Sequence, residues 1–334
     1  MGAAAIFGCE GTVLSARERD FFREADPWGF ILFSRNIDTP AQVAELTDAL
    51  RGAVGRDAPV LVDQEGGRVQ RLRAPHWREW LPPLEQAERA GEDAPRSFWL
   101  RSRIMAEELR GLGIDVNCAP TCDVAGLMTH PFLQNRCLGS DPQSVIANAR
   151  ATAEGLLAGG VLPVIKHMPG HGRAIADSHK GLPVVEASAE DLRAQDFVPF
   201  AALADLPLGM TAHIRFTALD PDHPATQSPR IVRLIREEIG FSGLLMSDDI
   251  GMEALSGGPG TRAAAVIGAG CDLVLHCNGE LAEMEEVALA IPAMSAAAEA
   301  RAQAALDLRS PSEPVDTDAL DAELEALLSG GADG

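Results

Sequence analysis

The sequence has no long apolar segment and few basic residues for its size. No apolar run approaches the ~20 residues that a transmembrane helix needs, so we expect no membrane partner. The 28 Lys and Arg residues are outnumbered by 49 Asp and Glu residues, which gives a net charge of −21. Phosphate backbones and anionic membrane surfaces repel such a chain. The composition therefore argues against nucleic-acid binding, and we expect no nucleic-acid partner.

Patterns for export and for metal binding are missing as well. Residues 3–8 are too short for the apolar part of a signal peptide, and no basic residue precedes them, so we expect a cytoplasmic protein. The six cysteines form no CxxC pair and no zinc-type spacing with histidine. We therefore expect buried, reduced thiols and no cofactor.

The chain does contain a regular series of short apolar runs. Eight runs end in polar or glycine residues and are separated by segments of helix length. Because their hydrophobicity is continuous rather than alternating, they predict strands of a parallel sheet that is covered on both faces. The runs are residues 3–9, 29–34, 59–63, 113–118, 161–167, 207–213, 243–248 and 271–277.

Several of the intervening segments carry signals for the start of a helix. Thr39, Asp141 and Ser228 each precede a proline, which is typical of an N-cap residue before proline at the first helical position. Ser188 with Asp191 forms a capping-box pattern that predicts a helix over residues 192–204. Eight strand–helix units predict an α/β protein with a single (β/α)8 TIM-type barrel. A doubly wound open sheet is the alternative, although no Gly-x-Gly-x-x-Gly follows the first run.

The character of the sequence changes near its C-terminal end. An Ala-rich segment over residues 294–308 predicts a helix, Ser310-Pro311 breaks it, and residues 319–328 predict a short acidic amphipathic helix. We expect residues 1–292 to form the catalytic barrel. We expect residues 293–334 to form a helical extension that packs on the barrel, with a frayed tail and no second domain.

Ionisable residues follow directly on several of the apolar runs. In a parallel barrel the carboxyl ends of the strands meet at one face, where active sites lie. A buried charge is costly unless it is paired or used, so their coincidence predicts a functional site at this end. These residues are Asp63, Lys166, His167, His213, Asp248 and Asp249.

A long glycine-punctuated loop over residues 168–186 is the second functional signal. It carries Asp177 and His179, which point to the same side of an extended segment. The carboxylate can then orient the imidazole for proton transfer near neutral pH. The alternative is that Asp177 caps a turn while His179 is solvated.

A zinc site is a further alternative for the same loop. His167, His171 and His179 could converge with Asp177 as the fourth ligand. Lys166 adjoins them, and a nearby ammonium disfavours a divalent cation. We therefore expect no metal.

Three ordered motifs resemble a known family. Residues 234–251 (LIREEIGFSGLLMSDDIG) resemble the signature of glycoside hydrolase family 3. Residues 62–72 (VDQEGGRVQRL) and 166–172 (KHMPGHG), followed by Asp177-Ser178-His179, resemble its branch of β-N-acetylhexosaminidases that recycle peptidoglycan (NagZ-type). The resemblance extends over about residues 5–290. Residues 173–176 depart from the Asp-Thr that often follows Gly-His-Gly in this branch.

The resemblance implies a role for each matching position. Asp248 is the nucleophile, and His179, supported by Asp177, is the acid/base. The sugar in the first subsite is held by Asp63, Arg71, Arg136, Lys166 and His167. The implied activity is that of a retaining exo-β-N-acetylglucosaminidase, active as a monomer or weak homodimer. Its implied substrates are muropeptides that contain N-acetylglucosamine.

Other functions stay open at this point. A β-glucosidase or xylosidase of the same family, an N-acetylglucosaminide phosphorylase, a metal-dependent hydrolase and an inactive barrel that binds wall fragments are the alternatives. Around the nucleophile we expect Lys166 or Arg71 to keep Asp248 ionised. We expect Asp249 to be a buried support and Glu65 to pair with a base such as Arg68.

Overall fold

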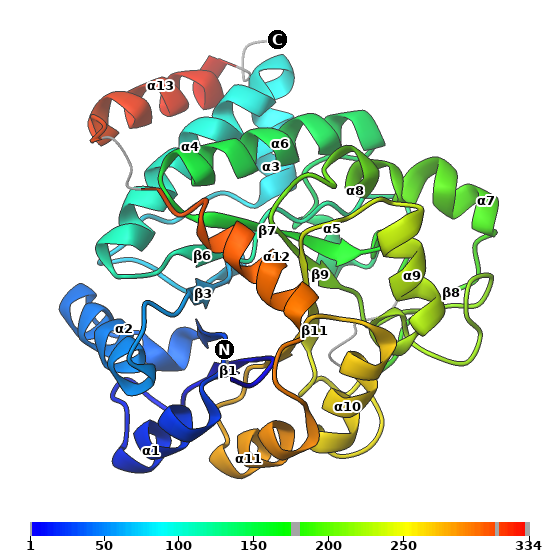
Figure 1. Ribbon diagram of the computed structural model, residues 1–334. Coiled ribbons are helices and arrows are strands. Elements are labelled where there is room, and N and C mark those ends of the chain that lie inside the picture. The colour runs from blue at the N-terminus through cyan, green and yellow to red at the C-terminus, as the bar shows by residue number, and fades with distance from the viewer. Residues whose placement is uncertain (1, 175–180, 311–313, 331–334) are drawn as a thin grey trace.

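A closed ring of parallel strands forms the centre of the molecule (Figure 1). The computed structural model describes residues 2–174, 181–310 and 314–330. The ring order is β1-β12-β11-β9-β7-β6-β3-β2, and β1 pairs with both β2 and β12, which closes the barrel. The strands are β1 (Ala5–Gly8), β2 (Gly29–Leu32), β3 (Val60–Val62), β6 (Val116–Asn117), β7 (Leu162–Met168), β9 (Leu208–Thr211), β11 (Leu244–Asp249) and β12 (Leu273–His276). The predicted (β/α)8 barrel is confirmed, and the open doubly wound sheet is wrong.

The continuous apolar runs are buried on both faces, as a parallel sheet requires. Consecutive residues such as Leu61 and Val62 are both fully buried, so one packs inside the ring and the other under the helices.

Two small two-stranded sheets lie in the loops that follow the barrel strands. They are β4 (Gln64–Gly66) with β5 (Val69–Gln70), and β8 (Val184–Val185) with β10 (Arg215–Phe216).

Helices surround the ring and begin where the sequence predicts. Thr39, Asp141 and Ser228 accept backbone N–H bonds of the first turns of α2, α6 and α9, with proline next in each helix. The helices between β1 and the end of the barrel are α1 (Ala16–Ala25), α2 (Pro40–Val54), α3 (Pro83–Ala90), α4 (Ala94–Gly111), α5 (Pro131–Gln134), α6 (Pro142–Ala158), α7 (Ala189–Asp191), α8 (Val198–Ala202), α9 (Pro229–Glu237), α10 (Pro259–Ala269) and α11 (Leu281–Ala290).

The helix predicted over residues 192–204 differs in detail. It begins three residues earlier, as α7, because Ser188 Oγ accepts the N–H of Asp191 and so caps the chain at that point. A turn of π-helix then precedes α8, with the N–H of Phe197 donating to Leu192 O. Pro199 has no N–H to continue an α-helical ladder there, which accounts for the interruption.

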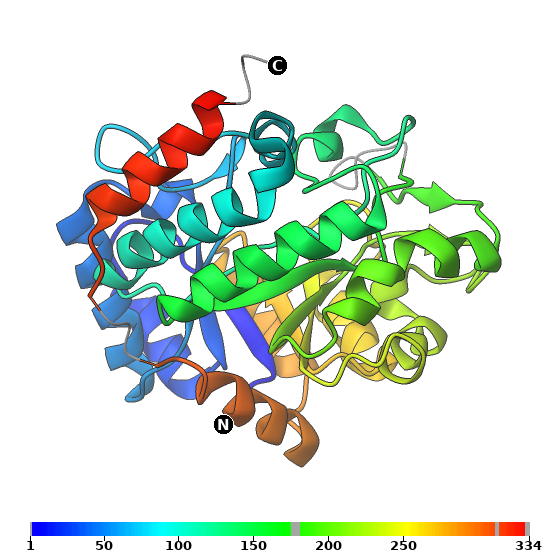
Figure 2. The ribbon, with the colours of Figure 1, turned by 90° about the horizontal axis from the view of Figure 1, so that it is seen from above.

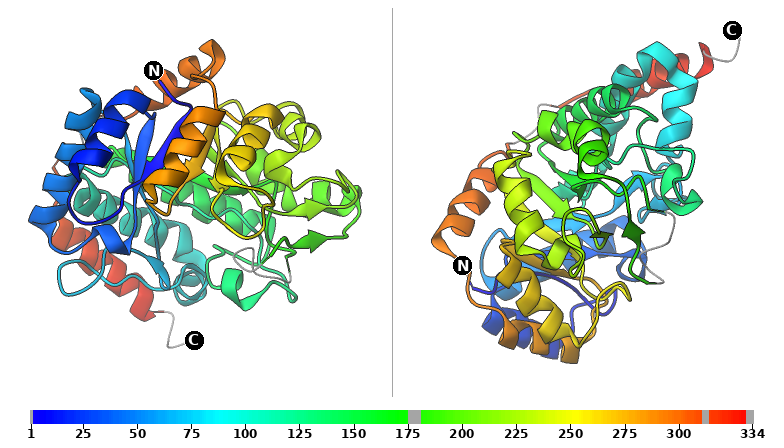
Figure 3. Two further views of the ribbon diagram at one scale, coloured as in Figure 1. Left: turned by 90° about the horizontal axis from the view of Figure 1, so that it is seen from below. Right: turned by 90° about the vertical axis from the view of Figure 1, so that its right-hand side faces the viewer.

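The C-terminal helices lie on the outside of the barrel. Helix α12 (Ala296–Leu306) crosses the end of the barrel that faces the viewer in Figure 1. Helix α13 (Thr317–Gly330) runs beside α3 and α4, as Figures 2 and 3 show. None of the helices in the described ranges is long and apolar enough to cross a membrane.

Two buried carboxylates fasten this C-terminal segment to the amino ends of the strands. Asp115 precedes β6, and its Oδ1 accepts the N–H of Val60 in β3 at 2.8 Å. Its other oxygen accepts from Arg51 of α2 at 3.2 Å and from Arg309 beyond α12 at 2.5 Å. One carboxylate thus joins two strands, a barrel helix and the C-terminal segment.

Asp272 repeats this arrangement in front of β12. Its Oδ2 accepts the N–H of Leu245 in β11 at 2.9 Å and Arg236 Nη2 at 2.6 Å. Arg301 of α12 donates from Nη2 to its Oδ1 at 2.7 Å. Because α12 covers the amino ends, the carboxyl ends of the strands stay open for a site.

Replacing Asp272 with Asn tests this attachment. The substitution removes the charge that two guanidinium groups share, so we expect the free energy of unfolding to fall by about 2–3 kcal/mol. Urea denaturation measures the change. The matched control is Asp20→Asn, since Asp20 pairs only with Arg23 and both side chains are more than 60% exposed. The control is expected to change stability by less than about 0.5 kcal/mol, and equal effects of the two substitutions would contradict the attachment.

Candidate active site

A cavity of about 220 Å³ opens at the carboxyl ends of the barrel strands. Its wall is polar on one side, with carboxylate, guanidinium, ammonium and imidazole groups, and apolar on the other. The lining side chains come from β2, β5, β7, β9, β11, β12 and the loops that follow several of the barrel strands. They are Ile31, Phe33, Asp63, Arg68, Val69, Arg71, Arg136, Lys166, His167, His171, Met210, Asp248, Asp249, Met252, Leu275 and Cys277.

Asp248 lies at the end of β11 and faces this cavity. Its Oδ1 accepts the N–H of Asp249 at 2.8 Å, and no ion pair to its carboxylate occurs within the described ranges. Burial alone would raise the pKa of Asp248, but the nearby His213 and His167 and the Asp249 N–H lower it below its ordinary value. The result is an ionised carboxylate with no cation in contact.

The two cations expected to support Asp248 contact another carboxylate. Lys166 Nζ lies 2.9 Å from Asp63 Oδ1, and Arg71 Nη2 lies 3.0 Å from Asp63 Oδ2. Burial raises the pKa of Asp63, but these two cations hold it well below its ordinary value. Lys166 therefore lowers the pKa of Asp248 through space rather than by contact, which agrees with the expectation that it helps to keep Asp248 ionised, while Arg71 pairs with Asp63.

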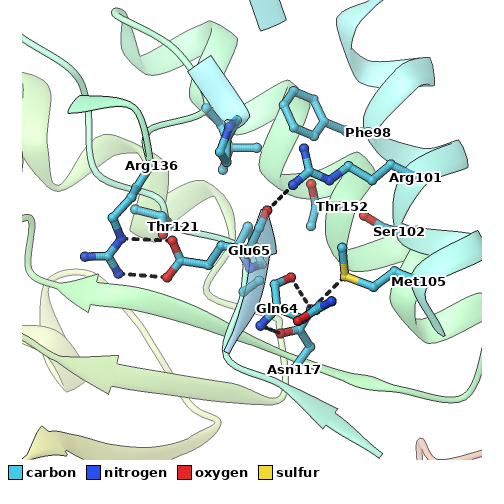
Figure 4. A pocket seen from close by; sticks show the side chains of 14 residues that line it. Gln64, Glu65, Phe98, Arg101, Ser102, Met105, Asn117, Thr121, Arg136 and Thr152 are labelled. Carbon is cyan, nitrogen blue, oxygen red and sulfur yellow. Dashed lines mark hydrogen bonds and ion pairs between the residues drawn. The ribbon is translucent and has the colours of Figure 1, made fainter. Parts of the chain in front are cut away.

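Glu65 on β4 links the ammonium of Lys166 to Arg136. Its Oε1 lies 2.6 Å from Lys166 Nζ, and Arg136 binds both of its oxygens, at 2.7 and 2.9 Å (Figure 4). The expected partner Arg68 is wrong, since the turn at Gly66-Gly67 places Arg68 at the exposed rim. Burial raises the pKa of Glu65, but Arg136 and Lys166 lower it to about 2. The order Arg71–Asp63–Lys166–Glu65–Arg136 is thus a continuous chain of alternating charges.

A second, smaller cavity lies beside Glu65. It is lined by residues that include Met105, Thr121 and Arg101 (Figure 4). Arg101 donates to the main-chain oxygen of Glu65 and to Leu81 O. A Cβ at Gly66 would overlap the Arg101 guanidinium, so only glycine fits at this point. These contacts fix the hairpin that carries Glu65.

His167 is oriented by a carboxylate that the sequence analysis did not identify. Its Nδ1 lies 2.7 Å from Asp123 Oδ2, and Asp123 Oδ1 accepts the N–H of His171 at 2.6 Å. Nε2 of His167 then faces Arg136 at 3.4 Å, across the wall of the cavity. The peptide bond between Lys166 and His167 is cis, and both side chains line the cavity.

In the sequence, His171 was considered only as a zinc ligand. Its ring lies 5.4 Å from that of His167, and it lines the same cavity. Burial and the neighbouring His167 lower its pKa to about 4, so it is neutral at physiological pH. In the parts of the chain that the structure describes, no three His, Cys, Asp or Glu side chains are placed to hold a metal ion together.

Phe33, at the end of β2, completes the apolar side. The Arg71 guanidinium lies over its ring, 4.6 Å from the centroid, and both side chains line the cavity. Arg71 Nε is buried and has no hydrogen-bond partner in the described residues. An aromatic face beside a free N–H donor suits a ligand with both apolar and polar surfaces.

Most of the residues that the sequence analysis assigned to the site lie together. The cavity wall contains Asp248, Asp63, Arg71, Arg136, Lys166 and His167. Asp177 and His179 lie outside the described residues. The sequence analysis missed Asp123, which follows the fourth apolar run by five residues, and Phe33, which ends the second. Asp123 lies beyond the end of its run and Phe33 is not ionisable, so a search for ionisable residues directly after the runs finds neither.

Asp249 is placed as expected for a support. Its Oδ1 accepts the N–H of Gly251 at 2.9 Å and that of Cys277 at 3.1 Å. Burial raises its pKa above the ordinary value. Neighbouring carboxylates at positions 248 and 249 therefore have opposite pKa shifts, lowered for Asp248 and raised for Asp249.

Comparison with known proteins agrees with this geometry. Residues 16–307 match the glycosyl hydrolase family 3 N terminal domain. A beta-hexosaminidase from Stenotrophomonas maltophilia strain K279a is 38% identical over 291 residues, with 83% of this chain and 84% of the relative covered.

Two solved structures resemble the whole fold. The native NagZ from Neisseria gonorrhoeae has a TM-score of 0.84 at 28% identity, with 100% of this chain and 98% of that chain covered. A family 3 beta-N-acetylglucosaminidase from Paenibacillus sp. str. FPU-7 has a TM-score of 0.85 at 29% identity. The match covers 97% of this chain but 66% of that longer chain. Because the family match spans most of its length, the chain belongs to glycosyl hydrolase family 3 and is a glycoside hydrolase.

Proposed function

We propose that this glycoside hydrolase removes terminal β-linked N-acetylglucosamine with retention of configuration. The observation that carries the proposal is the Asp248 carboxylate, which is ionised, faces the cavity and has no cation in contact in the described residues. A carboxylate that is held by a guanidinium is a weaker nucleophile, because the ion pair stabilises the charge that has to attack the sugar. The relatives named beta-hexosaminidase and beta-N-acetylglucosaminidase support the choice of sugar.

The proposed reaction has two displacement steps. In the first, an Asp248 oxygen forms a bond to C1 of the sugar while the bond from C1 to the leaving oxygen breaks. His179, as imidazolium, gives its proton to that oxygen, and Asp177 stabilises the charged ring. In the second step, water attacks C1, its proton goes to His179, and the ester to Asp248 breaks. Two inversions at C1 release the sugar in the β configuration.

The chain of alternating charges suits the hydroxyl groups of a sugar. Each carboxylate oxygen of Asp63 binds one cation, so its remaining lone pairs are available to accept hydrogen bonds from sugar hydroxyls. Arg71, Lys166, Arg136 and His167 supply donors around it. We propose that these five residues hold the terminal sugar, with Phe33 under an apolar face of the ring.

We further propose that the natural substrates are peptidoglycan-derived muropeptides, including anhydro forms, and that the product sugar enters cell-wall recycling. The resemblance of residues 62–72 and 166–172 and of the Asp177-Ser178-His179 motif supports this choice. No cofactor takes part in the proposed steps. The monomer or weak homodimer and the cytoplasmic location stay predictions.

Replacing Asp248 with Asn tests the nucleophile. We expect turnover of 4-nitrophenyl N-acetyl-β-glucosaminide to fall by at least about 10³-fold, because an amide cannot form the intermediate. A 5-fluoro N-acetylglucosaminyl fluoride should label the parent protein, and mass spectrometry should find the label on Asp248. The matched control is Asp249→Asn, which should not abolish labelling. Parent-like turnover by Asp248→Asn, or a label on another side chain, would falsify the proposal.

Replacing His179 with Ala tests the proton donor. We expect hydrolysis of a natural disaccharide to fall by about 10²–10⁴-fold. The nitrophenyl glycoside should lose much less in its first step, because nitrophenolate leaves without a proton. The comparison is made from kcat/KM on both substrates. Equal losses on the two substrates would exclude His179 as the acid, and Asp177→Asn should follow the same pattern with smaller losses.

A further inference from the structure

His213 is a fully buried histidine beside the site that the proposed reaction does not use. It follows β9 and does not line the cavity. Its Nε2 lies 2.9 Å from the main-chain oxygen of Asp249, and its Nδ1 lies 2.9 Å from Thr226 Oγ1. A carbonyl oxygen can only accept, so Nε2 carries a hydrogen and donates it to Asp249 O.

Thr226 fixes the orientation of this ring. Its Oγ1 lies 2.9 Å from Ala212 O and 2.8 Å from Thr211 Oγ1, in addition to the contact with His213. Burial lowers the pKa of His213 although Asp248 favours the charged form, so the ring is neutral at physiological pH. With the hydrogen on Nε2, Nδ1 is unprotonated and lies 2.9 Å from Thr226 Oγ1, whose single hydrogen is shared between Nδ1 and Ala212 O. The imidazole therefore connects β9 to the end of β11 in one defined tautomer.

The peptide group that His213 binds comes directly after the nucleophile. The N–H of Asp249 donates to Asp248 Oδ1 at 2.8 Å, so the position of residue 249 sets the direction of the Asp248 carboxylate. The Asp249 side chain is held by N–H groups of Gly251 and Cys277, and its carbonyl oxygen also accepts from Met252 N at 3.2 Å. His213 is the one side chain among these contacts that comes from another barrel strand.

We propose that His213 is a positioning residue that holds the Asp249 peptide group, and through it the Asp248 carboxylate, in line with C1 of the sugar. The proposal rests on the proposed function, because it needs Asp248 to be the nucleophile. An error of about 1 Å in the position of a reacting atom can cost about 10² in rate. The effect belongs to kcat, since His213 does not reach the sugar-binding wall.

Two substitutions separate positioning from packing. In His213→Gln the amide nitrogen lies near the former Nε2 and can still donate to Asp249 O, whereas in His213→Asn it lies near the former Nδ1 and can contact only Thr226. On 4-nitrophenyl N-acetyl-β-glucosaminide we expect Gln to keep kcat within about 5-fold of the parent and Asn to lower it by about 10–100-fold. KM should change by less than about 3-fold in both, because the cavity wall is unchanged.

A merely structural role predicts a different result. Each variant loses one of the two hydrogen bonds of a buried ring, so both should have similarly lowered melting temperatures. If His213 served packing alone, the two variants would also have equal kcat values. Equal kcat values would therefore overturn the proposal. Thr226→Val, which keeps the side-chain volume and removes the hydroxyl, serves if His213→Asn does not fold. It should lower kcat by about 10-fold, and a parent-like kcat would overturn the proposal as well.

The same assay distinguishes failure of this inference from failure of the proposed function. If the Asp248→Asn protein is active, Asp248 is not the nucleophile, and the proposed function fails. An inactive Asp248→Asn protein together with equal His213→Gln and His213→Asn variants would overturn the positioning role alone.

Discussion

A buried ammonium group shared between two carboxylates holds the wall of the candidate active site together. Lys166 is 2% exposed, and an unpaired charge at that depth would be very costly. Burial alone would lower its pKa, but Asp63 and Glu65 raise it above the ordinary value. In turn the lysine, with Arg71 and Arg136, keeps both carboxylates ionised. Removing any one of these charged side chains would leave its neighbour unpaired, so the charged groups of the wall depend on one another.

The same constraint leaves one carboxylate free. Because the cations of the wall are already bound to Asp63 and Glu65, none contacts Asp248 in the described residues. Histidine rings at positions 167 and 213 and one backbone N–H lower its pKa without neutralising it. The barrel thus separates the charges of the wall, which are paired, from the charge of Asp248, which is oriented but not paired. At the amino ends of the strands, by contrast, Asp115 and Asp272 are both paired with arginines, and these ion pairs stabilise the fold.

Much of this arrangement could be predicted from the sequence because strand position and polarity are local signals. Each of the eight apolar runs overlaps a barrel strand, and the ends of three runs supplied Asp63, Lys166, His167 and Asp248. Pairing across the barrel could not be predicted, because Glu65 and Arg136 are 71 residues apart and nothing local selects Arg136 over Arg68. Asp123 was missed for a related reason, since it lies in a loop beyond its run and is identified only by its contact with His167.

Closure of the ring between β1 and β12 has a consequence for the chain during its synthesis. The cations of the wall come from β7 and from segments before it, while Asp248 comes from β11 and the last part of the cavity wall from Cys277 after β12. A nascent chain that has left the ribosome only as far as β9 therefore contains the cations of the wall but not yet Asp248. The cavity with Asp248 in its wall is complete only when the final strand has closed the ring.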